Sequence, residues 1–324
     1  MACSFVAGGA GFIGGHLVRR LLQAPEAEVV VYDNFSSGRR WHLPALLENA
    51  RLRIVTGDLR DLDRLKRAMP AATETVFHLA SNPDIARAAR EPDIDFWEGT
   101  YLTQNLLEAM REHGVRQLVY ASGSGVYGDT GETPVREEGI PLRPISTYGA
   151  SKLACEALIR AYCHMFGMHA LAFRFANVVG PRQTHGVAYD FVRNLLRDPE
   201  KLTILGDGTQ SKSYIHVEDV VEALLHLRGQ GMAGFEEYNV ATADYLSVTE
   251  IARMCAERVG AGEVVFKYTG GDRGWKGDVP VVRFDTSKIQ ARGWSPRYTS
   301  SEAMGRAIDA LIVDARAGRF DGEC

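Results

Sequence analysis

The sequence lacks any long apolar run and any leader segment. No stretch of the 324 residues reaches the roughly 18 consecutive apolar residues of a membrane span. The first residues lead directly into an apolar strand pattern, without the regions of a signal peptide. We therefore expect no membrane partner and a cytoplasmic location.

Cysteine is scarce, and no two cysteines form a C-x-x-C pair. The five cysteines are Cys3, Cys155, Cys163, Cys255 and Cys324. We interpret them as reduced packing residues of a cytoplasmic protein. The nine histidines likewise show no H-E-x-x-H or similar spacing, so we expect no metal.

The sequence also has little excess of charge of either sign. The formal net charge is -4, and the sequence has no basic cluster, so we do not expect nucleic acid as the main partner. With 324 residues, 45% of them hydrophobic, the chain is long enough for one large α/β unit or two modest domains.

The strongest positive feature is a glycine-rich turn near the N-terminus. An apolar strand pattern runs into Gly8, Gly11 and Gly14, and an amphipathic helix pattern begins at Phe12 and Ile13. The first glycine allows a tight turn, the second lets the backbone approach a pyrophosphate, and the third lets the helix pack close to the strand. The helix N-terminus then offers free N–H groups to the phosphates.

An acid follows at the position that selects between dinucleotides. Asp33 lies 19 residues after Gly14, at the end of the next apolar run. A carboxylate there binds a ribose 2′-hydroxyl and repels a 2′-phosphate, which favours NAD over NADP. The polar loop that follows either wraps the adenosine ribose or is a solvated turn. That loop consists of Phe35, Ser36, Ser37 and Gly38.

The next two strand patterns end at the expected ligand crevice. Asp58 and Leu59 follow one of them, where an acid is well placed for an adenine amino group. The small residues Ala80 and Ser81 follow the other and would let a cofactor pass over the sheet edge. We interpret His78, just before them, as a core histidine rather than a catalyst.

A tyrosine and a lysine follow a nearly side-chain-free loop. The strand pattern 117–121 opens into the loop 122–128, and Tyr148 lies 26 residues after Ser122. Tyr148 and Lys152 are four residues apart, so they share one face of a helix. A lysine ammonium beside a phenol stabilises the phenolate, which gives a general acid/base that works near neutrality.

Strand and helix patterns alternate regularly up to about residue 176 and less regularly afterwards. This alternation predicts a Rossmann-type doubly wound parallel sheet, with a smaller α/β C-terminal substrate lobe. We expect an NAD-binding domain over 1–176 and the second lobe over 177–324. We expect a segment near 212–242 to return to the first domain.

Together these motifs resemble the extended short-chain dehydrogenase/reductase family, in particular its nucleotide-sugar epimerases and dehydratases. The matching pieces are G-G-A-G-F-I-G (8–14), Y-D-N (32–34), G-D-L (57–59), H-L-A (78–80), V-Y-G (126–128), Y-G-A-S-K (148–152) and G-D-G-T-Q…Y-I-H-V-x-D (206–219). The resemblance implies that NAD stays bound and that a nucleotide diphosphate sugar sits in the C-terminal lobe. It also implies that the tyrosine accepts the proton of the sugar 4-hydroxyl while hydride moves from C4 to NAD.

The resemblance and the patterns above assign a set of cofactor-binding residues, and the resemblance implies a homodimer through helices near Ile94 and Tyr148. The cofactor-binding residues are Gly8, Gly11, Phe12, Ile13, Gly14, Asp33, Asn34, Ser36, Ser37, Gly38, Asp58, Leu59, Leu79, Ala80, Ser81, Tyr148, Lys152 and Phe175.

The loop before V-Y-G distinguishes reactions within the family. Similar 4,6-dehydratases carry Asp-Glu there, where this chain has Ser124 and Gly125. The glutamate of UDP-glucuronate decarboxylases and the cysteine of GDP-sugar 3,5-epimerases are also absent. With no second acid or base, the resemblance implies oxidation at C4, rotation of the 4-ketose and return of the hydride, which is 4-epimerisation. Decarboxylation or dehydration is the less favoured alternative, and a non-catalytic NAD-binding protein is a third.

The resemblance also places the remaining site residues. Ser122, Tyr148 and Lys152 are the expected catalytic residues, with Ser122 bonding the sugar O4 and Ser124 as the alternative. Gly99 stands where the family often has an asparagine.

Four further residues are expected at the nucleotide diphosphate or the sugar. Asn177 matches an asparagine with such a contact, and Lys212 replaces an arginine, as a point charge without a bidentate fork. Arg273 resembles the arginine that reaches the diphosphate. Asp278 ends the same glycine-rich loop.

Arg182 is the residue we connect to substrate choice. A guanidinium in the sugar pocket pairs bidentately with a C6 carboxylate, and His185 and Tyr189 are expected to line the same pocket. The G-P-R-Q run of 180–183 occurs in relatives that act on UDP-glucuronate and in relatives that act on neutral sugars. We favour epimerisation of UDP-glucuronate to UDP-galacturonate, with UDP-glucose and UDP-galactose as the alternative pair.

Overall fold

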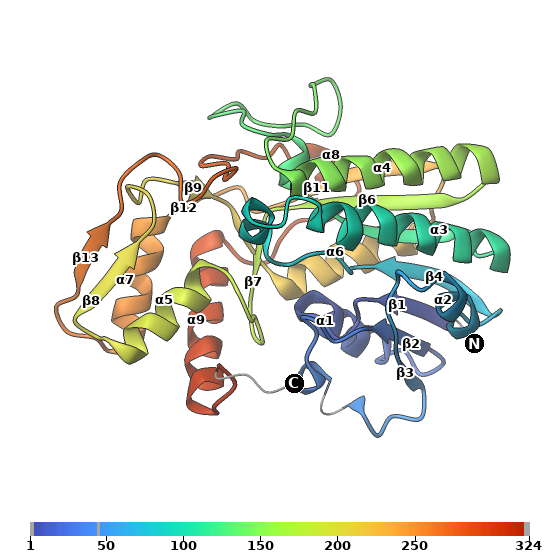
Figure 1. Cartoon of the computed structure of the whole chain (residues 1–324), viewed down its shortest axis with the longest axis horizontal. Helices are drawn as coiled ribbons and strands as arrows, with labels where there is room; N and C mark the ends of the chain where they lie inside the picture. The colour runs from blue at the N-terminus through green and yellow to red at the C-terminus, as the bar shows by residue number, and fades with distance from the viewer. Residues whose placement is uncertain (1–2, 44–45, 321–324) are drawn as a thin grey trace.

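A parallel sheet of seven strands forms the centre of the molecule. The computed structural model describes residues 3–43 and 46–320. The strand order is β11-β6-β5-β4-β1-β2-β3, which confirms the predicted Rossmann-type doubly wound sheet (Figure 1). The strands are β1 (Cys3–Ala7), β2 (Glu28–Asp33), β3 (Leu52–Thr56), β4 (Thr73–His78), β5 (Gln117–Gly123), β6 (His169–Phe175) and β11 (Phe235–Val240).

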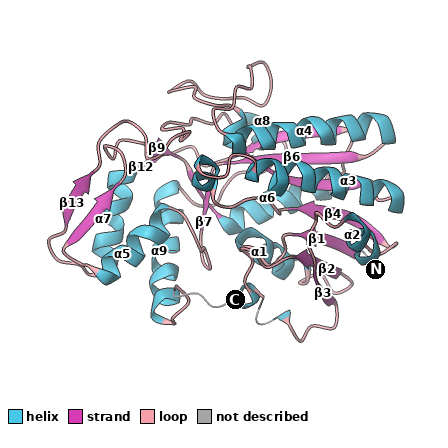
Figure 2. Cartoon of the chain, viewed as in Figure 1, coloured by secondary structure: helices cyan, strands magenta, loops and turns pink. Residues whose placement is uncertain are grey.

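Helices cover both faces of this sheet (Figure 2). Successive strand residues point to opposite faces, and β1 shows this: Phe5 belongs to one buried cluster and Val6 to another. The first cluster is covered by α2 (Leu62–Ala68), α3 (Tyr101–His113) and α4 (Thr147–Phe166), and the second by α1 (Phe12–Leu21) and α6 (Val217–Gly229).

A smaller C-terminal lobe has its own buried cluster. Its long helices start at sequence-encoded capping boxes, in which Ser247 pairs with Glu250 and Thr299 with Glu302. The lobe is built from α5 (Val187–Arg197), β8 (Lys201–Ile204), β9 (Ser211–Lys212), β12 (Leu246–Ser247), α7 (Val248–Val259), β13 (Val265–Tyr268) and α9 (Ser300–Arg316).

The chain passes between the two parts more than once. Strand β7 (Asn177–Val179) pairs with β10 (Tyr214–His216), and the chain then enters α6 and β11. Strand β11 lies beside β6 in the large sheet, so part of the segment 212–242 contributes an edge strand to it. Helix α8 (Ser287–Ala291) packs near this edge.

The described residues also bear on membrane spans, metal sites and cysteines. Within those ranges, no helix is long and apolar enough to cross a membrane, and no group of histidine, cysteine, aspartate or glutamate side chains could hold a metal ion. Cys3, Cys155, Cys163 and Cys255 are free and buried. Cys324 lies outside the described residues.

His78 is a core histidine, as the sequence predicted. Its side chain is 1% exposed, and Nε2 lies 2.9 Å from the Thr103 hydroxyl. Burial, and to a smaller extent the Lys152 charge, lowers the pKa of His78 to about 3. The folded protein therefore holds this ring neutral where the unfolded chain takes up a proton.

This burial predicts how stability depends on pH. Between the unfolded pKa of 6.5 and the folded value of about 3, the unfolded state binds more protons, so stability falls as the pH falls through that window. We expect His78→Gln to flatten the slope of the unfolding free energy by up to about 1.4 kcal/mol per pH unit. Urea unfolding at several pH values measures it. The exposed His164→Gln is the control, and equal slopes for wild type and His78→Gln would contradict the prediction.

Candidate active site

A pocket lies at the carboxyl ends of β1, β2 and β4. Most of the predicted cofactor-binding residues line it. They are Gly8, Gly11, Asp33, Asn34, Ser36, Ser37, Asp58, Leu59, Leu79, Ala80 and Ser81. Sequence reasoning missed five others, namely Tyr32, Gly57, Arg60, Glu98 and Leu102. Glu98 lies on a π-helical turn, Phe96–Thr100, that helical spacing alone does not reveal.

Asp33 ties the glycine turn to the loop that follows it. Its Oδ2 accepts a hydrogen bond from the Ala10 N–H at 2.9 Å, and its Oδ1 accepts one from the Phe35 N–H at 2.8 Å. Burial raises the pKa of this carboxyl, and the two backbone donors oppose that shift. A β-carbon at Gly38 would lie 2.7 Å from Oδ1, so the loop approaches the carboxylate closely.

The glycine turn itself is a close backbone contact. Gly8 has a φ of +81°, and a β-carbon there would lie 2.6 Å from the Ala80 nitrogen. A β-carbon at Gly14 would meet the Gly8 carbonyl and lie 2.7 Å from the Gly9 α-carbon. A side chain at either position would collide with the backbone that forms this turn. The residues present therefore fit the NAD that the sequence predicted.

Other predicted cofactor residues lie around this pocket without lining it. Phe12 and Ile13 form the first turn of α1, and Phe12 makes an edge contact with His16 at 5.8 Å between ring centroids. Phe175 ends β6 and is buried, with its ring 6.2 Å from that of Phe173. Phe175 is thus part of the core.

Tyr148 and Lys152 lie together on the first turns of α4. Ser146 caps this helix by accepting a hydrogen bond from the Gly149 N–H at 3.1 Å. Lys152 is buried, and its Nζ donates to the Ala121 carbonyl at 2.7 Å and lies 5.5 Å from the centre of the Tyr148 ring. A half-exposed phenol beside a fixed ammonium is suited to proton transfer.

The structure does not place the Ser122 hydroxyl beside Tyr148. Ser122 is 4% exposed, and its Oγ donates to Oε1 of Glu156 at 2.6 Å. The next residue, Gly123, faces the phenol, since a β-carbon there would lie 3.9 Å from the Tyr148 oxygen. Ser122 points to the face of the sheet that α4 covers, as Leu118 and Tyr120 do, and its hydroxyl reaches Glu156, two helical turns after Tyr148. Ser124 is half-buried, and its hydroxyl makes no hydrogen bond within the described residues.

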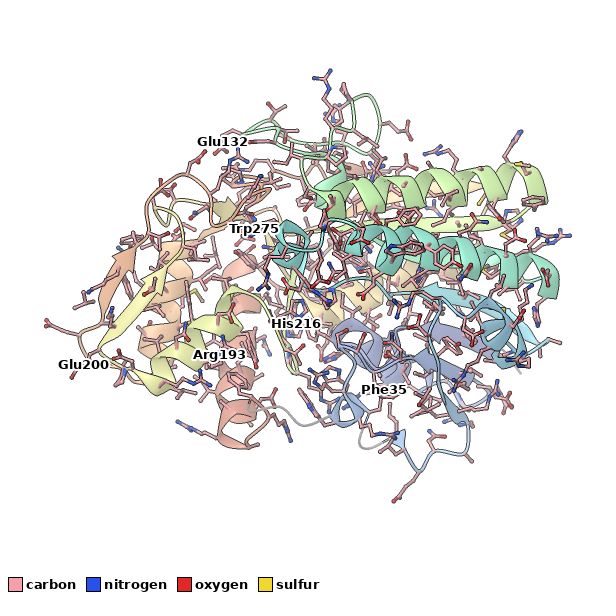
Figure 3. The ribbon with its side chains drawn as sticks, in the orientation of Figure 1. Phe35, Glu132, Arg193, Glu200, His216 and Trp275 are labelled. Carbon is pink, nitrogen blue, oxygen red and sulfur yellow. The ribbon has the colours of Figure 1, made fainter. Side chains whose placement is uncertain are left out.

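The structure brings Lys212, Arg273 and Asp278 together. Lys212 Nζ donates to Asp278 Oδ1 at 2.7 Å, and Arg273 donates to the Asp278 carbonyl at 2.7 Å and to Asp129 Oδ2 at 2.6 Å. Asn177 is exposed, and its N–H bonds the carbonyl of Ser213, next to Lys212. Sequence reasoning missed Asp129, although it directly follows V-Y-G. In Figure 3, the labelled Trp275 marks this loop and Phe35 marks the cofactor side.

The structure does not bring Arg182 or Tyr189 to the same place. Arg182 donates from Nη1 to the His42 carbonyl at 2.9 Å, and its N–H donates to Asp314 at 3.2 Å. The Tyr189 ring packs on Phe320 at 4.4 Å between centroids. The Arg182 guanidinium is thus bound to the loop after β2.

His185 follows β7 in the chain. It is exposed at the surface between β7 and α5. The place of Arg182, His185 and Tyr189 in the sugar pocket therefore stays a prediction.

Comparison with known proteins finds similar chains over the whole length. Residues 4–241 match the NAD dependent epimerase/dehydratase family. The chain is 32% identical to UDP-glucose 4-epimerase of Mycolicibacterium smegmatis, over 94% of this chain and 97% of that protein. A solved UDP-galactose 4-epimerase is 39% identical with a TM-score of 0.86, over 96% of this chain and 99% of that one.

A further solved structure is a UDP-glucuronic acid 4-epimerase from Bacillus cereus, in complex with NAD and UDP-4-deoxy-4-fluoro-glucuronic acid. It is 25% identical with a TM-score of 0.86, over 95% of this chain and 98% of that one.

The backbone contact at Gly14 predicts a loss of cofactor on substitution. Gly14→Ala forces α1 away from the turn, so we expect destabilisation by about 1–3 kcal/mol and protein that purifies without NAD. Nucleotide released by denaturation and the thermal midpoint measure both effects. Gly229→Ala, at a helical glycine with open space around it, is the matched control. Retention of NAD by Gly14→Ala would show that the close contact is not needed.

Proposed function

The chain belongs to the NAD dependent epimerase/dehydratase family, and on that premise we propose that it is an NAD-dependent UDP-sugar 4-epimerase acting on UDP-glucose and UDP-galactose. The observation that carries the proposal is the Tyr148–Lys152 pair beside a loop with no second acid or base. The loop 122–128 contains only serine, glycine, valine and tyrosine. Elimination or decarboxylation would need a further proton-transfer group there.

The side chains of this protein then have separate tasks. Bound NAD supplies the hydride acceptor and donor for the sugar C4. Tyr148 removes the proton of the sugar 4-hydroxyl and returns it to the epimer, and Lys152 holds the phenol in its reactive form. Lys212 and Arg273 neutralise the diphosphate. With Ser122 directed to Glu156, we assign the O4 hydrogen bond to Ser124.

We propose a neutral sugar in place of the UDP-glucuronate that the sequence favoured. That preference rested on an Arg182 guanidinium inside the sugar pocket. Arg182 instead donates to the His42 carbonyl, so pairing with a C6 carboxylate would require this bond to break. UDP-glucuronate stays the second candidate, because the similar Bacillus cereus enzyme takes that acid.

We also propose a homodimer and keep the cytoplasmic location as a prediction. Helices α3 and α4 lie side by side on one face of the molecule. Helix α4 and the turn before α3 carry four exposed apolar side chains, which a partner subunit would cover. These are Phe96, Trp97, Met165 and Phe166.

The decisive experiment is proton NMR of UDP-glucose incubated with purified protein and no added reductant. We expect UDP-galactose to appear and the same ratio to be reached from either sugar, because the reaction consumes no reductant. A parallel sample holds UDP-glucuronate. Turnover of the acid alone would overturn the neutral-sugar assignment, and a decarboxylated or 4-keto-6-deoxy product would overturn epimerisation.

Removal of the phenol oxygen of Tyr148 tests the assignment of this residue as the general acid/base. We expect Tyr148→Phe to lower kcat by at least about 100-fold, since the 4-hydroxyl proton then has no acceptor. NAD content should stay as in wild type. Tyr268→Phe, in β13 of the smaller lobe, is the control for loss of a phenol oxygen. Near-normal turnover by Tyr148→Phe would show that another group carries the proton.

A further inference from the structure

Four residues spaced by four run along one side of α4. They are Tyr148, Lys152, Glu156 and Arg160. Residues four apart lie on neighbouring turns of one helix face. The first two form the proposed proton-transfer pair, whereas Glu156 has no task in the proposed function. Glu156 is only 3% exposed, and a buried carboxylate must be paired.

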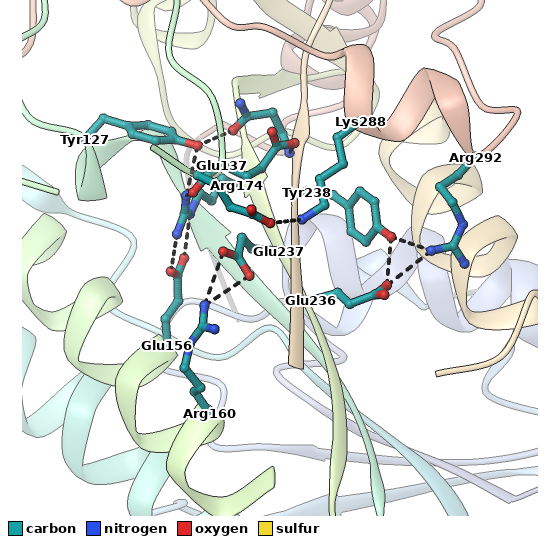
Figure 4. Close-up of polar contacts among 12 residues, drawn as sticks. Tyr127, Glu137, Glu156, Arg160, Arg174, Glu236, Glu237, Tyr238, Lys288 and Arg292 are labelled. Carbon is teal, nitrogen blue, oxygen red and sulfur yellow. Dashed lines mark hydrogen bonds and ion pairs between the residues drawn. The ribbon is translucent and has the colours of Figure 1, made fainter. Parts of the chain in front are cut away.

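Glu156 accepts hydrogen bonds from two side chains of the sheet. Arg174 donates from Nε to Oε1 at 3.0 Å and from Nη2 to Oε2 at 2.7 Å, a bidentate pair (Figure 4). Ser122 donates to Oε1 at 2.6 Å. Ser122 and Arg174 are direct neighbours in the β5–β6 pairing. The carboxylate therefore joins α4 to two adjacent strands.

Arg174 is itself held on its remaining side. Its Nη1 donates to the Tyr127 hydroxyl at 3.0 Å and to the Glu137 carbonyl at 3.1 Å. Tyr127 in turn donates to Asn239 Oδ1 at 2.6 Å. Arg174 is 1% exposed. The guanidinium is thus bonded on both sides and almost fully buried, which restricts its position.

We propose that the buried Glu156–Arg174 ion pair is a positioning device for Tyr148 and Lys152. It fixes the end of β5 against α4 through Ser122, and it keeps the Glu156 carboxylate away from the Lys152 ammonium. The inference rests on the proposed function of the Tyr148–Lys152 pair.

The mechanical part follows from two consecutive anchors. Lys152 donates to the carbonyl of Ala121, and Glu156, one helical turn later, accepts from Ser122. Neighbouring residues of β5 are thus bound to neighbouring turns of α4. This double attachment sets the separation between Tyr148 and the loop that begins at Gly123, where the sugar O4 must lie.

The electrostatic part follows from competition for the ammonium. Glu156 is four residues from Lys152, a spacing at which opposite charges on a helix attract each other. Both carboxylate oxygens are occupied by Arg174, however, and in the described chain Lys152 forms no ion pair with Glu156. Lys152 bonds the Ala121 carbonyl instead and stays beside Tyr148.

The first test releases the carboxylate. In Arg174→Met, Glu156 is free to attract Lys152, and we expect kcat to fall by about 100-fold, as for a displaced catalytic group, with KM nearly unchanged. The double variant Arg174→Met with Glu156→Gln removes the competing charge, and we expect at least about tenfold of the lost kcat to return. A double variant no more active than Arg174→Met overturns the proposal.

The second test removes only the hydrogen bond between Ser122 and Glu156. The Glu156–Arg174 ion pair stays intact, so the test does not require a protein that folds with one of the two charges unpaired. We expect Ser122→Ala to lower kcat by about tenfold and to move the acidic limb of the kcat/KM profile to higher pH, because the ammonium is less well placed on the phenol. The matched control is Ser4→Ala, which removes an equally buried serine (4% exposed) near the amino end of β1. A lower kcat with an unmoved limb, as expected for Ser124→Ala, overturns the positioning role.

A failure of the proposed function is distinguishable from a failure of this inference. If wild type turns over neither UDP-glucose nor UDP-glucuronate, the proposed function fails. Ultraviolet titration of the Tyr148 phenolate, taken as the difference between each protein and its Tyr148→Phe form, then replaces the kinetic profile. Identical titrations for wild type and Ser122→Ala overturn the inference without any substrate.

Discussion

The cofactor pocket depends on close contacts between backbone segments that have glycine at the points of contact. Gly8 and Gly14 bring the first turn, the start of α1 and the end of β4 to distances at which a β-carbon would collide. Asp33 then binds the Ala10 and Phe35 N–H groups, so the end of β2 is attached to the same turn. Main-chain packing therefore fixes the glycine turn at the pocket, and side chains line the rest of the pocket.

The two kinds of ion pair in this molecule have opposite properties. Arg273–Asp129 is partly exposed, and exposed pairs contribute only about 0–1 kcal/mol. Lys212 is partly exposed too, although its partner Asp278 is buried. A diphosphate can take over these cations at little cost, with charge-assisted bonds in place of the carboxylates. Arg174–Glu156 lies in the core with 2% and 4% exposed side chains. Breaking it would leave a buried charge, so it is suited to holding groups in place and not to exchanging them.

The sequence predicted the sheet, the cofactor pocket and the Tyr148–Lys152 pair because each depends on local patterns. Each of these patterns lies within one or two neighbouring helices or strands. They are the strand periodicity, the glycine spacing and the pair of residues four apart on a helix. The orientation of the serines in this loop could not be predicted, because adjacent residues of a strand point to opposite faces, and the motif left open which of 122 to 124 faces the phenol. The contacts of Arg182 could not be predicted because its partners, His42 and Asp314, are each more than a hundred residues away. No local pattern reveals such a contact.

Apolar side chains could fill the place of the Glu156–Arg174 ion pair in the core. The free-energy cost of burying charge therefore raises the question of why the pair is there. A buried Arg–Glu pair loses hydration of both charges, and well-packed apolar residues often give equal or greater stability. Stability alone therefore does not account for Glu156 and Arg174. A charged pair does what apolar side chains cannot: its bidentate geometry fixes an orientation, and its remaining lone pair accepts the Ser122 hydroxyl. The same carboxylate, left unpaired one turn from Lys152, would compete with the phenol for the ammonium. The proposed positioning role at the end of β5 therefore accounts for a charged pair where stability alone does not.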